Sequence, residues 1–326
     1  MNRIQWIGVD IAKRSFVAAK RFRKGFRTQS FDLNAEGVQA FHKWLPRKPQ
    51  LQIVVESTGP YWRAFTWELE KWAPALPVAV VNPRRVRDFA KASPQASKTD
   101  PLDAQLLIFF ADTFDPPPHQ PESSSPHYCL RVVCRHTLQL RQQLDLVRDQ
   151  QEKAAVDPYT PQEVLLSLQQ LQDHLQQALK RCWAQAGQLV RQDSGLYQTF
   201  CLLLSIPGLG EKTVLTLLGE YGLGLSHASP KQLTRYAGLD VILFESGESV
   251  RRRPRISKQG NWRIRRALFM AALVAIRHNP IIRTYYRRLL NRGLAKMTAL
   301  VASMRKLLHL CYGVLKNQTP FDPAFS

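Results

Sequence analysis

Four acidic residues stand at points where regular elements are expected to begin or end. Asp10 closes the apolar run IQWIGVD, Glu56 closes LQIVVE, and Asp100 and Asp103 open the helix-like stretch TDPLDAQLLIFF. If these elements converge, the carboxylates repel one another and must take up protons or bind cations. Two Mg²⁺ ions held by Asp and Glu can activate a nucleophile and stabilise the leaving oxygen in phosphodiester chemistry. The four residues therefore predict a magnesium site that acts on a nucleic-acid backbone.

The same residues also have an ordinary structural interpretation. Asp100 before Pro101, with Asp103 three positions after the first, matches a helix N-cap, a proline at the first helical position and an acid in the first turn. Asp10 and Glu56 at strand ends could be surface turn residues. Taken alone, the Asp100 pattern favours this structural interpretation.

The elements that must position these residues lie in the first third of the chain. The runs IQWIGVDIAK, SFVAAKRF, LQIVVES and LPVAVVNP are of the kind buried in a sheet. Helices are expected around AEGVQAFHKWL and YWRAFTWELEKW. This order predicts an α/β domain over residues 1–126, which ends in the breaker-rich stretch DPPPHQPESSSP.

Residues 127–193 carry apolar side chains at helical spacing among many Gln, Leu and Arg. The pattern predicts two long helices, separated by the prolines of VDPYTP. They could fold back as an antiparallel hairpin or pair with another protomer as coiled-coil helices. An assembly arm and an ordinary intramolecular helix pair fit the pattern equally well.

Residues 194–326 are expected to be mainly helical, and they begin with a glycine-rich turn in IPGLGEKT. Helical runs flank this turn, as in a helix-hairpin-helix. Backbone N–H groups around Gly208 and Gly210, together with Lys212, could bind a phosphate without reading sequence. A plain packing corner between two helices is the alternative.

Positive charge dominates the chain, with 46 Lys and Arg against 25 Asp and Glu and a formal net charge of +21. Between Ser249 and Phe321 there is no acidic residue, but there are thirteen arginines and four lysines. A tract of one sign with interleaved aromatic residues is typical of a surface that binds the nucleic-acid backbone. The cations expected to bind nucleic acid are Arg251, Arg252, Arg253, Arg255, Lys258, Arg263, Arg265 and Arg266.

Other classes of protein are disfavoured. The five cysteines and eight histidines show neither a disulfide framework nor the spacing of a zinc site. No apolar run reaches the roughly 18 residues of a membrane span, and the N-terminus does not resemble a secretory signal. We expect a cytoplasmic, nucleoid-associated protein of prokaryotic type, without a membrane partner.

Seven ordered blocks carry a family resemblance. They are GVDIAK at 8–13, ESTGPYW at 56–62, VNP at 81–83, KTDPLDA at 98–104, IPGLGEKT at 206–213, ESGESVR at 245–251 and ISKQGNWRIRRALFMAA at 256–272. Through these blocks, which span nearly the whole chain, the sequence resembles the DEDD-type insertion-sequence transposases. These are the bridge-RNA-guided recombinases of the insertion-sequence one-ten family.

The resemblance implies an N-terminal RNase H-like (RuvC-like) domain, a coiled-coil insertion and a C-terminal transposase domain with a serine nucleophile. Asp10, Glu56, Asp100 and Asp103 match the family's acidic residues, which hold Mg²⁺, and Ser246 matches its serine. The serine would form a covalent link to DNA while the acidic site assists from another protomer. The implied partners are target DNA, donor DNA, a structured guide RNA and further copies of the chain, as a dimer or a dimer of dimers.

Some alternatives remain open at this level. Ser249 is as close to the arginines in sequence as Ser246, and only the resemblance favours Ser246. A junction nuclease that uses the metal site alone and hydrolyses with water is a second functional hypothesis. A non-catalytic scaffold that binds RNA or DNA is a third.

Overall fold

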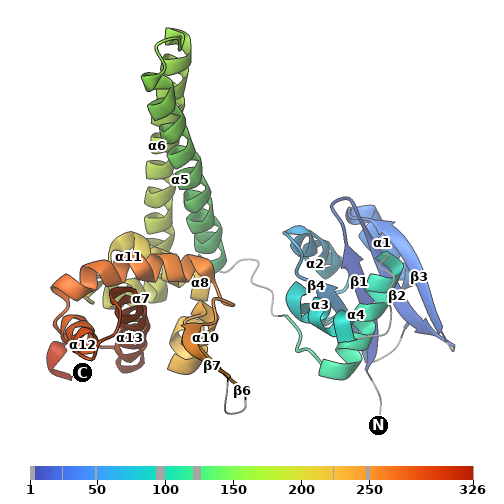
Figure 1. Cartoon of the computed structure of the whole chain (residues 1–326). Helices are drawn as coiled ribbons and strands as arrows, with labels where there is room; N and C mark the ends of the chain where they lie inside the picture. The colour runs from blue at the N-terminus through green and yellow to red at the C-terminus, as the bar shows by residue number, and fades with distance from the viewer. Residues whose placement is uncertain are drawn as a thin grey trace. The chain divides into compact units, whose positions relative to one another are not determined.

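The chain forms two compact units, Met1–Ser123 and Ser124–Ser326, each described here by itself (Figure 1). The computed structural model describes residues 4–23, 25–47, 50–92, 100–119, 126–222, 224–246 and 250–325. Within these ranges, the side chains of residues 92, 226, 243–246, 250–254 and 325 lie outside the description. The expected mixed α/β class is confirmed, and the finer division at residues 126 and 193 stays a prediction.

The first unit is built on a five-stranded sheet of order β3-β2-β1-β4-β5. Its strands are β1 (Gln5–Ile11), β2 (Ser15–Phe22), β3 (Gly25–Asp32), β4 (Leu51–Glu56) and β5 (Val78–Val81). β2 is antiparallel to β1 and β3, whereas β4 is parallel to β1 and β5 is parallel to β4. The carboxyl ends of β1, β4 and β5 therefore meet at one edge of the sheet, which is where ligands bind in open α/β sheets.

Helices cover both faces of this sheet. They are α1 (Ala35–Trp44), α2 (Tyr61–Trp72), α3 (Pro83–Ala92) and α4 (Asp100–Phe114). On one face, Phe41 of α1 and Phe65 of α2 pack on Phe16 of β2, with ring centroids 5.4 and 4.9 Å from that ring. On the other face, Leu107 and Phe110 of α4 are buried in a separate core. These two apolar layers fix the strands whose ends carry Asp10 and Glu56.

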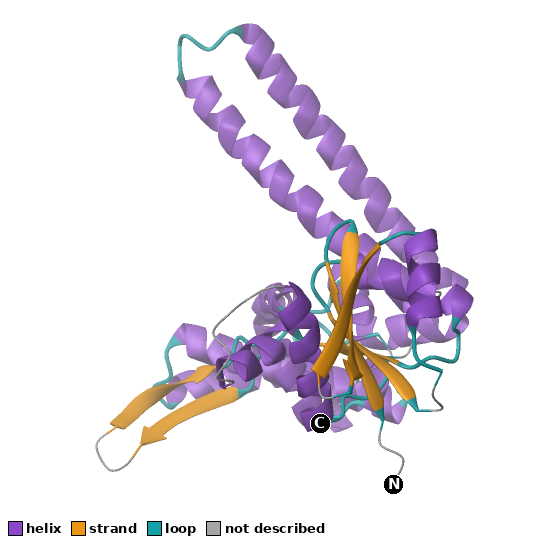
Figure 2. Ribbon diagram, turned by 90° about the vertical axis from the view of Figure 1, so that its right-hand side faces the viewer, coloured by secondary structure: helices purple, strands orange, loops and turns teal. Residues whose placement is uncertain are grey.

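A long helical hairpin extends from the second unit (Figure 2). Its helices, α5 (Pro126–Val156) and α6 (Gln162–Gln192), have 31 residues each. Leu140, Leu144 and Val147 of α5 pack against Leu175 of α6. The helices thus pair within the chain. Leu171 of α6 stands four residues before Leu175, at the same helical spacing, but it is 45% exposed.

The remainder of the second unit is a helical core with one two-stranded sheet. Its helices are α7 (Ser194–Leu204), α8 (Glu211–Tyr221), α9 (Gly224–His227), α10 (Pro230–Ala237), α11 (Trp262–His278), α12 (Pro280–Asn291), α13 (Lys296–Asn317) and the 3-10 turn η1 (Pro323–Phe325). The antiparallel strands are β6 (Val241–Ser246) and β7 (Val250–Ile256). α8 is buried from Val214 to Tyr221, because α5 and α11 both pack against it. Among the described residues, no helix is long and apolar enough to cross a membrane.

Candidate active site

Asp10 and Glu56 lie next to each other on one face of the first sheet. β1 and β4 are parallel and pair Val9 with Val55, so the two acids occupy the following position on each strand. Side chains alternate between the faces of a strand. Val54, two residues before Glu56, is buried in the core beneath α4. Both carboxylates therefore emerge on the α4 face, at the carboxyl edge of the sheet.

Helix α4 brings the other two acids to this edge because it packs unusually close to β1. A Cβ atom on Gly8 would overlap the backbone carbonyl oxygen of Ala104, so only glycine permits this approach. Asp100 and Asp103 precede Ala104 by four residues and one residue, at the N-terminal end of the helix. Residues four apart share a helix face, and side chains lean toward the helix N-terminus. The Gly8 contact thus places the first turn of α4 over the ends of β1 and β4.

Three of the four predicted acids form a compact group. Each of Asp10, Asp100 and Asp103 offers a ligand atom, and these atoms all lie within 4.8 Å of one another. Glu56 stands outside this group of three but adds its charge, and its Oε1 accepts a 2.7 Å hydrogen bond from the hydroxyl of Thr58. Burial, followed by the charges of Asp103, Asp100 and Glu56, raises the pKa of Asp10 from 3.8 to about 6.

The donor set fits a hard divalent cation. All the grouped ligand atoms are carboxylate oxygens, which suit Mg²⁺, Mn²⁺ or Ca²⁺, and no histidine or cysteine belongs to the group. A bound cation would also remove the mutual repulsion that raises the pKa of Asp10. The first-turn position of Asp100 and Asp103 agrees with the helix-start interpretation too. That interpretation does not account for their approach to Asp10.

The predicted nucleophile lies in the second unit, at the end of β6. The backbone of Ser246 pairs with Val250, so it borders the connection between β6 and β7. The side chain of Ser246 and residues 247–249, including Ser249, lie outside the described residues. The structure therefore gives the strand that carries Ser246 but does not choose between the two serines.

The base of this β-hairpin is firmly attached to the helices. The backbone N–H of Ser257 donates to Asp240 O at 2.9 Å, and that of Asn261 donates to Tyr236 O at 2.7 Å. Gly238 caps α10 with a φ of 66°, in the left-handed region that favours glycine. A Cβ on Gly260 would overlap the carbonyl oxygen of Tyr236. The residues before β6 and after β7 thus lock together, which fixes the origin of the hairpin.

A buried carboxylate, Glu220 of α8, holds three elements of the second unit together. Its side chain is 1% exposed. Arg135 of α5 donates to both carboxylate oxygens at 2.7 Å, and Asn261, the N-cap of α11, donates to Oε2 at 2.6 Å. Burial alone would raise the pKa of Glu220, but the hydrogen bonds from Arg135 and Asn261 outweigh it, and the pKa is lowered overall. We call these three residues the Glu220 clamp.

Sequence reasoning missed the Glu220 clamp. The available signal was an acid inside the otherwise apolar helix TVLTLLGEYG. Its partners lie 85 and 41 residues away in sequence, so no local pattern connects them.

The predicted nucleic-acid-binding cations differ in their surroundings. Lys258, Arg255 and Arg266 are exposed, as a binding role requires. Arg265 instead donates to the carbonyl oxygens of Ala237 and Gly260 at 2.8 and 2.9 Å, which is an internal structural role. Arg263 is half-buried, 3.9 Å from a carboxylate oxygen of the Glu220 clamp. The side chains of Arg251, Arg252 and Arg253 lie outside the described residues.

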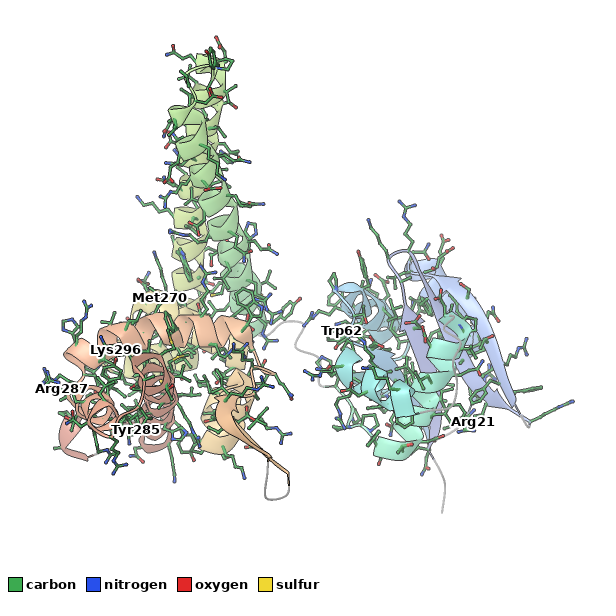
Figure 3. The ribbon with its side chains drawn as sticks, in the orientation of Figure 1. Arg21, Trp62, Met270, Tyr285, Arg287 and Lys296 are labelled. Carbon is green, nitrogen blue, oxygen red and sulfur yellow. The ribbon has the colours of Figure 1, made fainter. Side chains whose placement is uncertain are left out.

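The acid-free tract continues through α12 and α13. Tyr285, Arg287 and Lys296 are labelled in Figure 3; Arg287 and Lys296 are exposed, and Tyr285 is half-buried. Arg288 lies over the Tyr285 ring, 5.3 Å from its centroid. Exposed cations and aromatic rings on one helix are the two components expected of a backbone-binding surface.

The glycine-rich turn does connect two helices, α7 and α8. Gly208 has a φ of 106°, and a Cβ there would collide with Ala275 of α11, so one side of the turn is a packing contact. Gly210 is exposed, with open space where a Cβ would stand. Lys212 is exposed and lies 5.8 Å from the ring centroid of Trp183. Phosphate binding at Gly208, Gly210 and Lys212 stays a prediction.

Comparison with known proteins decides the family. A model described as the Transposase IS116/IS110/IS902 family matches residues 201–287, and a DEDD transposase model of the IS110 type matches residues 7–153. The "Pilin gene-inverting protein" of Moraxella bovis is 30% identical over 324 residues, 97% of each chain. The chain belongs to the IS110 family of transposases. The same-named protein of Moraxella lacunata is also 30% identical over 97% of each chain.

Further relatives match only part of this IS110-family transposase. An insertion element IS110 protein of Streptomyces coelicolor is 31% identical over 121 residues, which is 37% of this chain and 30% of that protein. The DEDD model covers Asp10, Glu56, Asp100 and Asp103, and the other model covers Ser246. The chain is therefore a DNA transposase or recombinase, and both family and geometry point to a divalent metal at the acidic group.

Proposed function

We propose that this transposase is an RNA-guided recombinase that excises and inserts its own mobile element, using Ser246 as nucleophile and Mg²⁺ at the acidic group. The observation that carries the proposal is the convergence of Asp10, Asp100 and Asp103 within 4.8 Å, with Glu56 adding its charge. The strand order β3-β2-β1-β4-β5 supports an RNase H-like core around this site.

The chemical step exchanges one phosphate ester for another. The hydroxyl oxygen of Ser246 attacks a DNA phosphorus, a serine–phosphate bond forms, and the bond to the leaving DNA oxygen breaks. The serine gives up its proton, and the leaving oxygen gains one. Because the new ester retains the energy of the broken one, the reverse reaction joins a different DNA end without ATP.

The chain's residues divide this work between its two units. Asp10, Glu56, Asp100 and Asp103 would hold the cation, as two ions or as one ion plus a second that arrives with substrate. When bound, Mg²⁺ lowers the pKa of a nucleophile and neutralises charge that builds up on the phosphate. Arg251, Arg252, Arg253 and Arg255 follow the serine in sequence and would neutralise the same phosphate.

RNA guidance and assembly rest on family membership and on charge. A net charge of +21 suits a protein that holds RNA together with target and donor DNA. Base pairing to the RNA would supply sequence specificity while the protein holds the backbone. A dimer, or a dimer of dimers, would let the acidic group of one protomer serve the serine of another.

A metal-only junction nuclease is the second candidate, because the acidic group is complete within the first unit. It would hydrolyse DNA with water and leave protein-free ends. Membership of a transposase family disfavours the third candidate, a non-catalytic scaffold.

The decisive experiment detects protein covalently attached to labelled DNA after denaturation, with the co-purified RNA present. Wild type should form the adduct with Mg²⁺ and not with EDTA. Ser246→Ala should reduce the adduct to background, while the matched variant Ser249→Ala should retain it. Cleavage that persists in Ser246→Ala, with protein-free ends, would establish the metal-only nuclease instead.

A second variant tests the acidic group. Asp100→Asn should lose strand cleavage and keep nucleic-acid binding, since the exposed cations of the second unit do not depend on the metal. Joint loss of binding and of the folded state would support the helix-start interpretation of Asp100.

A further inference from the structure

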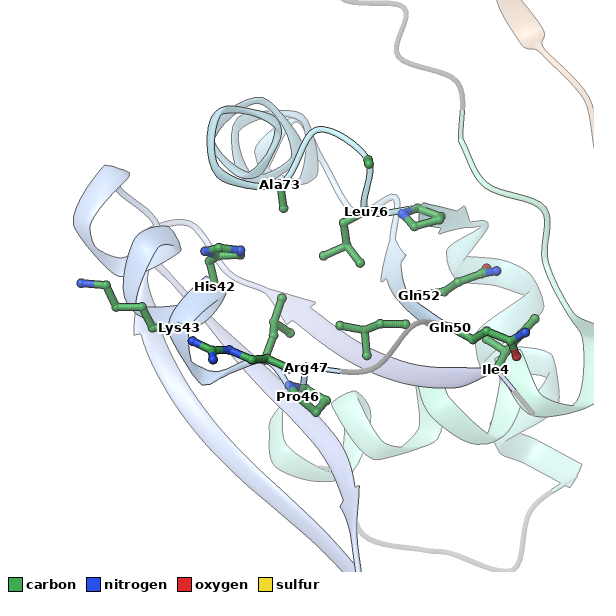
Figure 4. A pocket seen from close by; sticks show the side chains of 13 residues that line it. Ile4, His42, Lys43, Pro46, Arg47, Gln50, Gln52, Ala73 and Leu76 are labelled. Atoms are coloured by element: carbon green, nitrogen blue, oxygen red, sulfur yellow. The ribbon is translucent and has the colours of Figure 1, made fainter. Parts of the chain in front are cut away.

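A pocket opens on the first unit beneath the ends of α1 and α2 (Figure 4). Its volume is about 950 Å³. The polar groups that line it are two cations, an imidazole and two amides, carried by Lys43, Arg47, His42, Gln50 and Gln52. No acidic residue lines it among the described residues.

The pocket is separate from the acidic group. β1 and β4 begin beside the pocket, at Gln5 and Leu51, and run in parallel to Asp10 and Glu56. Five residues of strand span roughly 16 Å. The pocket therefore lies at the opposite edge of the sheet from the acids, and the proposed cleavage chemistry leaves it without a role.

We propose that this pocket receives an unpaired nucleotide from a single-stranded segment of the nucleic acid that the enzyme handles. Leu45, Leu51 and Leu76 provide apolar walls of the kind that accept the face of a base. Amide side chains such as Gln50 and Gln52 can donate to and accept from a base edge. Exposed Lys43 and Arg47 at the same pocket supply charge for the adjoining phosphates.

The β2–β3 hairpin extends this surface. Lys20 of β2 lies 3.8 Å from the ring centroid of Trp44 and donates to its carbonyl oxygen, and Trp44 directly precedes the wall residue Leu45. Farther along β2, Phe22 is 49% exposed, with the guanidinium of Arg23 over its ring at 5.3 Å. An exposed ring with a cation over it is a stacking platform for a neighbouring base.

Helix electrostatics offers a simpler reason for two of the cations. His42 and Lys43 stand in the last turn of α1, where positive charge is favoured by the helix dipole. Arg47 lies beyond the C-cap Leu45, outside the helix, and the dipole does not explain it. It also does not explain why no acid is found among the described residues of the lining, or why Gln50 and Gln52 both belong to it.

The test is photo-crosslinking of the full-length protein to a single-stranded oligonucleotide of about 12 residues carrying a photoreactive thio-base. Mass spectrometry should find crosslinks in the peptides spanning residues 42–52 or 73–77. Ribo- and deoxyribo-oligonucleotides are run in parallel; a crosslink with either supports the pocket and identifies its ligand, and a crosslink with neither overturns it. The same sequence as a duplex should not crosslink, and equal crosslinking of the duplex would also overturn the proposal.

Two variants separate a nucleotide pocket from a merely charged surface. Ala75 lines the pocket and is exposed, so Ala75→Leu should narrow the space without unfolding the unit and without adding a ring on which a base could stack. It should lower the site-specific yield at least about fivefold, as expected for losing one stacked base. The double variant Lys43→Ala with Arg47→Ala should also lower the site-specific crosslink yield, because it removes the charge beside the pocket.

A control with equal loss of charge is Arg141→Ala with Lys153→Ala, two exposed cations of α5 that pair with Asp145 and Asp149. It should leave the crosslink unchanged, and an equal loss in this control would overturn the proposal. Asp100→Asn should keep the crosslink while losing cleavage, so failure of the recombinase mechanism and failure of this pocket give different results.

Discussion

Asp10 decides how the acidic group responds to protons and cations. Its strand-end position was visible in the sequence, because an apolar run that stops at an acid marks the carboxyl edge of a sheet. Its proximity to Asp100 and Asp103 could not be read from the sequence in the same way, since it depends on Gly8 letting α4 approach β1. A glycine inside a strand pattern signals close approach of a backbone but does not name the partner.

Asp10→Asn should stabilise the metal-free protein at about pH 7.5 and abolish its stabilisation by Mg²⁺ or Mn²⁺. The pKa of Asp10 is raised from 3.8 to about 6. Between pH 3.8 and about 6, Asp10 is protonated in the folded protein but ionised in the unfolded chain. The free energy of unfolding of wild type in EDTA therefore rises as the pH falls from above 6 toward 3.8. Thermal unfolding with EDTA and with Mg²⁺ measures both effects. Asp32→Asn, at an exposed position of β3, is the control and should change neither.

Gly8→Ala should destabilise the protein by about 1–3 kcal/mol, the usual cost of overpacking. It should also weaken metal-dependent stabilisation, because α4 must move away from β1. Urea unfolding with and without Mg²⁺ measures both. Gly25→Ala is the matched control, since a Cβ there meets no atom within 4 Å. Equal losses in the two variants would contradict the close-approach argument.

At the scale of elements, the long helices were predictable and two β-elements were not. The spacing of Leu130, Leu140, Leu144 and Val147 predicted the buried side of α5, because a helical repeat is a local signal. The polar strand β3 was missed, since its GFRTQSFD sequence contributes little to the core and β2 supplies its pairing. The strands β6 and β7 were not assigned, because RRRPR carries no apolar alternation.

Arg135→Ala should cost about 3–5 kcal/mol, because it leaves the buried Glu220 charge without its main partner. Adding Glu220→Gln to this variant should restore part of the stability, since no buried charge then remains. The pKa of Glu220 is lowered in the folded protein from the usual value of 4.5. The ionised carboxylate therefore stabilises the fold at pH values above 4.5, and this stabilisation is lost as the pH falls through the lower pKa of the folded protein. Denaturant midpoints for the four-member cycle measure the coupling. Arg141→Ala, which breaks the exposed pair with Asp145, should cost less than about 1 kcal/mol.

At the scale of the whole molecule, positive charge is distributed unevenly. Residues 124–326 hold 28 Lys and Arg against 13 Asp and Glu, a net charge of +15, whereas residues 1–123 hold 18 against 12, a net charge of +6. The acidic group of Asp10, Asp100 and Asp103 belongs to the less charged unit. Composition alone shows this segregation, because charge counting needs no fold. The Glu220 clamp needed the structure, because its members are far apart in sequence.

When each unit is expressed alone and folds independently, the second should keep DNA binding and the first should keep its response to Mg²⁺. The second should bind duplex DNA with the steeper dependence of log affinity on log salt, by about 0.9 for each additional phosphate contact. The first should retain stabilisation by Mg²⁺, because its grouped acids lie within it. Fluorescence anisotropy across a salt series and thermal unfolding provide the two measurements. A steeper salt slope for the first unit would contradict the assignment of the binding surface.

Helix α5 begins in the core of the second unit and continues without a break to the tip of the hairpin. Arg135, near its lower end, is held by Glu220, while 21 further residues extend to Val156. At 1.5 Å per residue this is a lever of roughly 30 Å, and a tilt of about 5° at the base moves the tip by about 3 Å. The Glu220 clamp is the point at which the base of this helix is attached to the core. Asn261 of the same clamp is the N-cap of α11, so one carboxylate connects the base of the long hairpin to the helix that follows the β6–β7 strand pair.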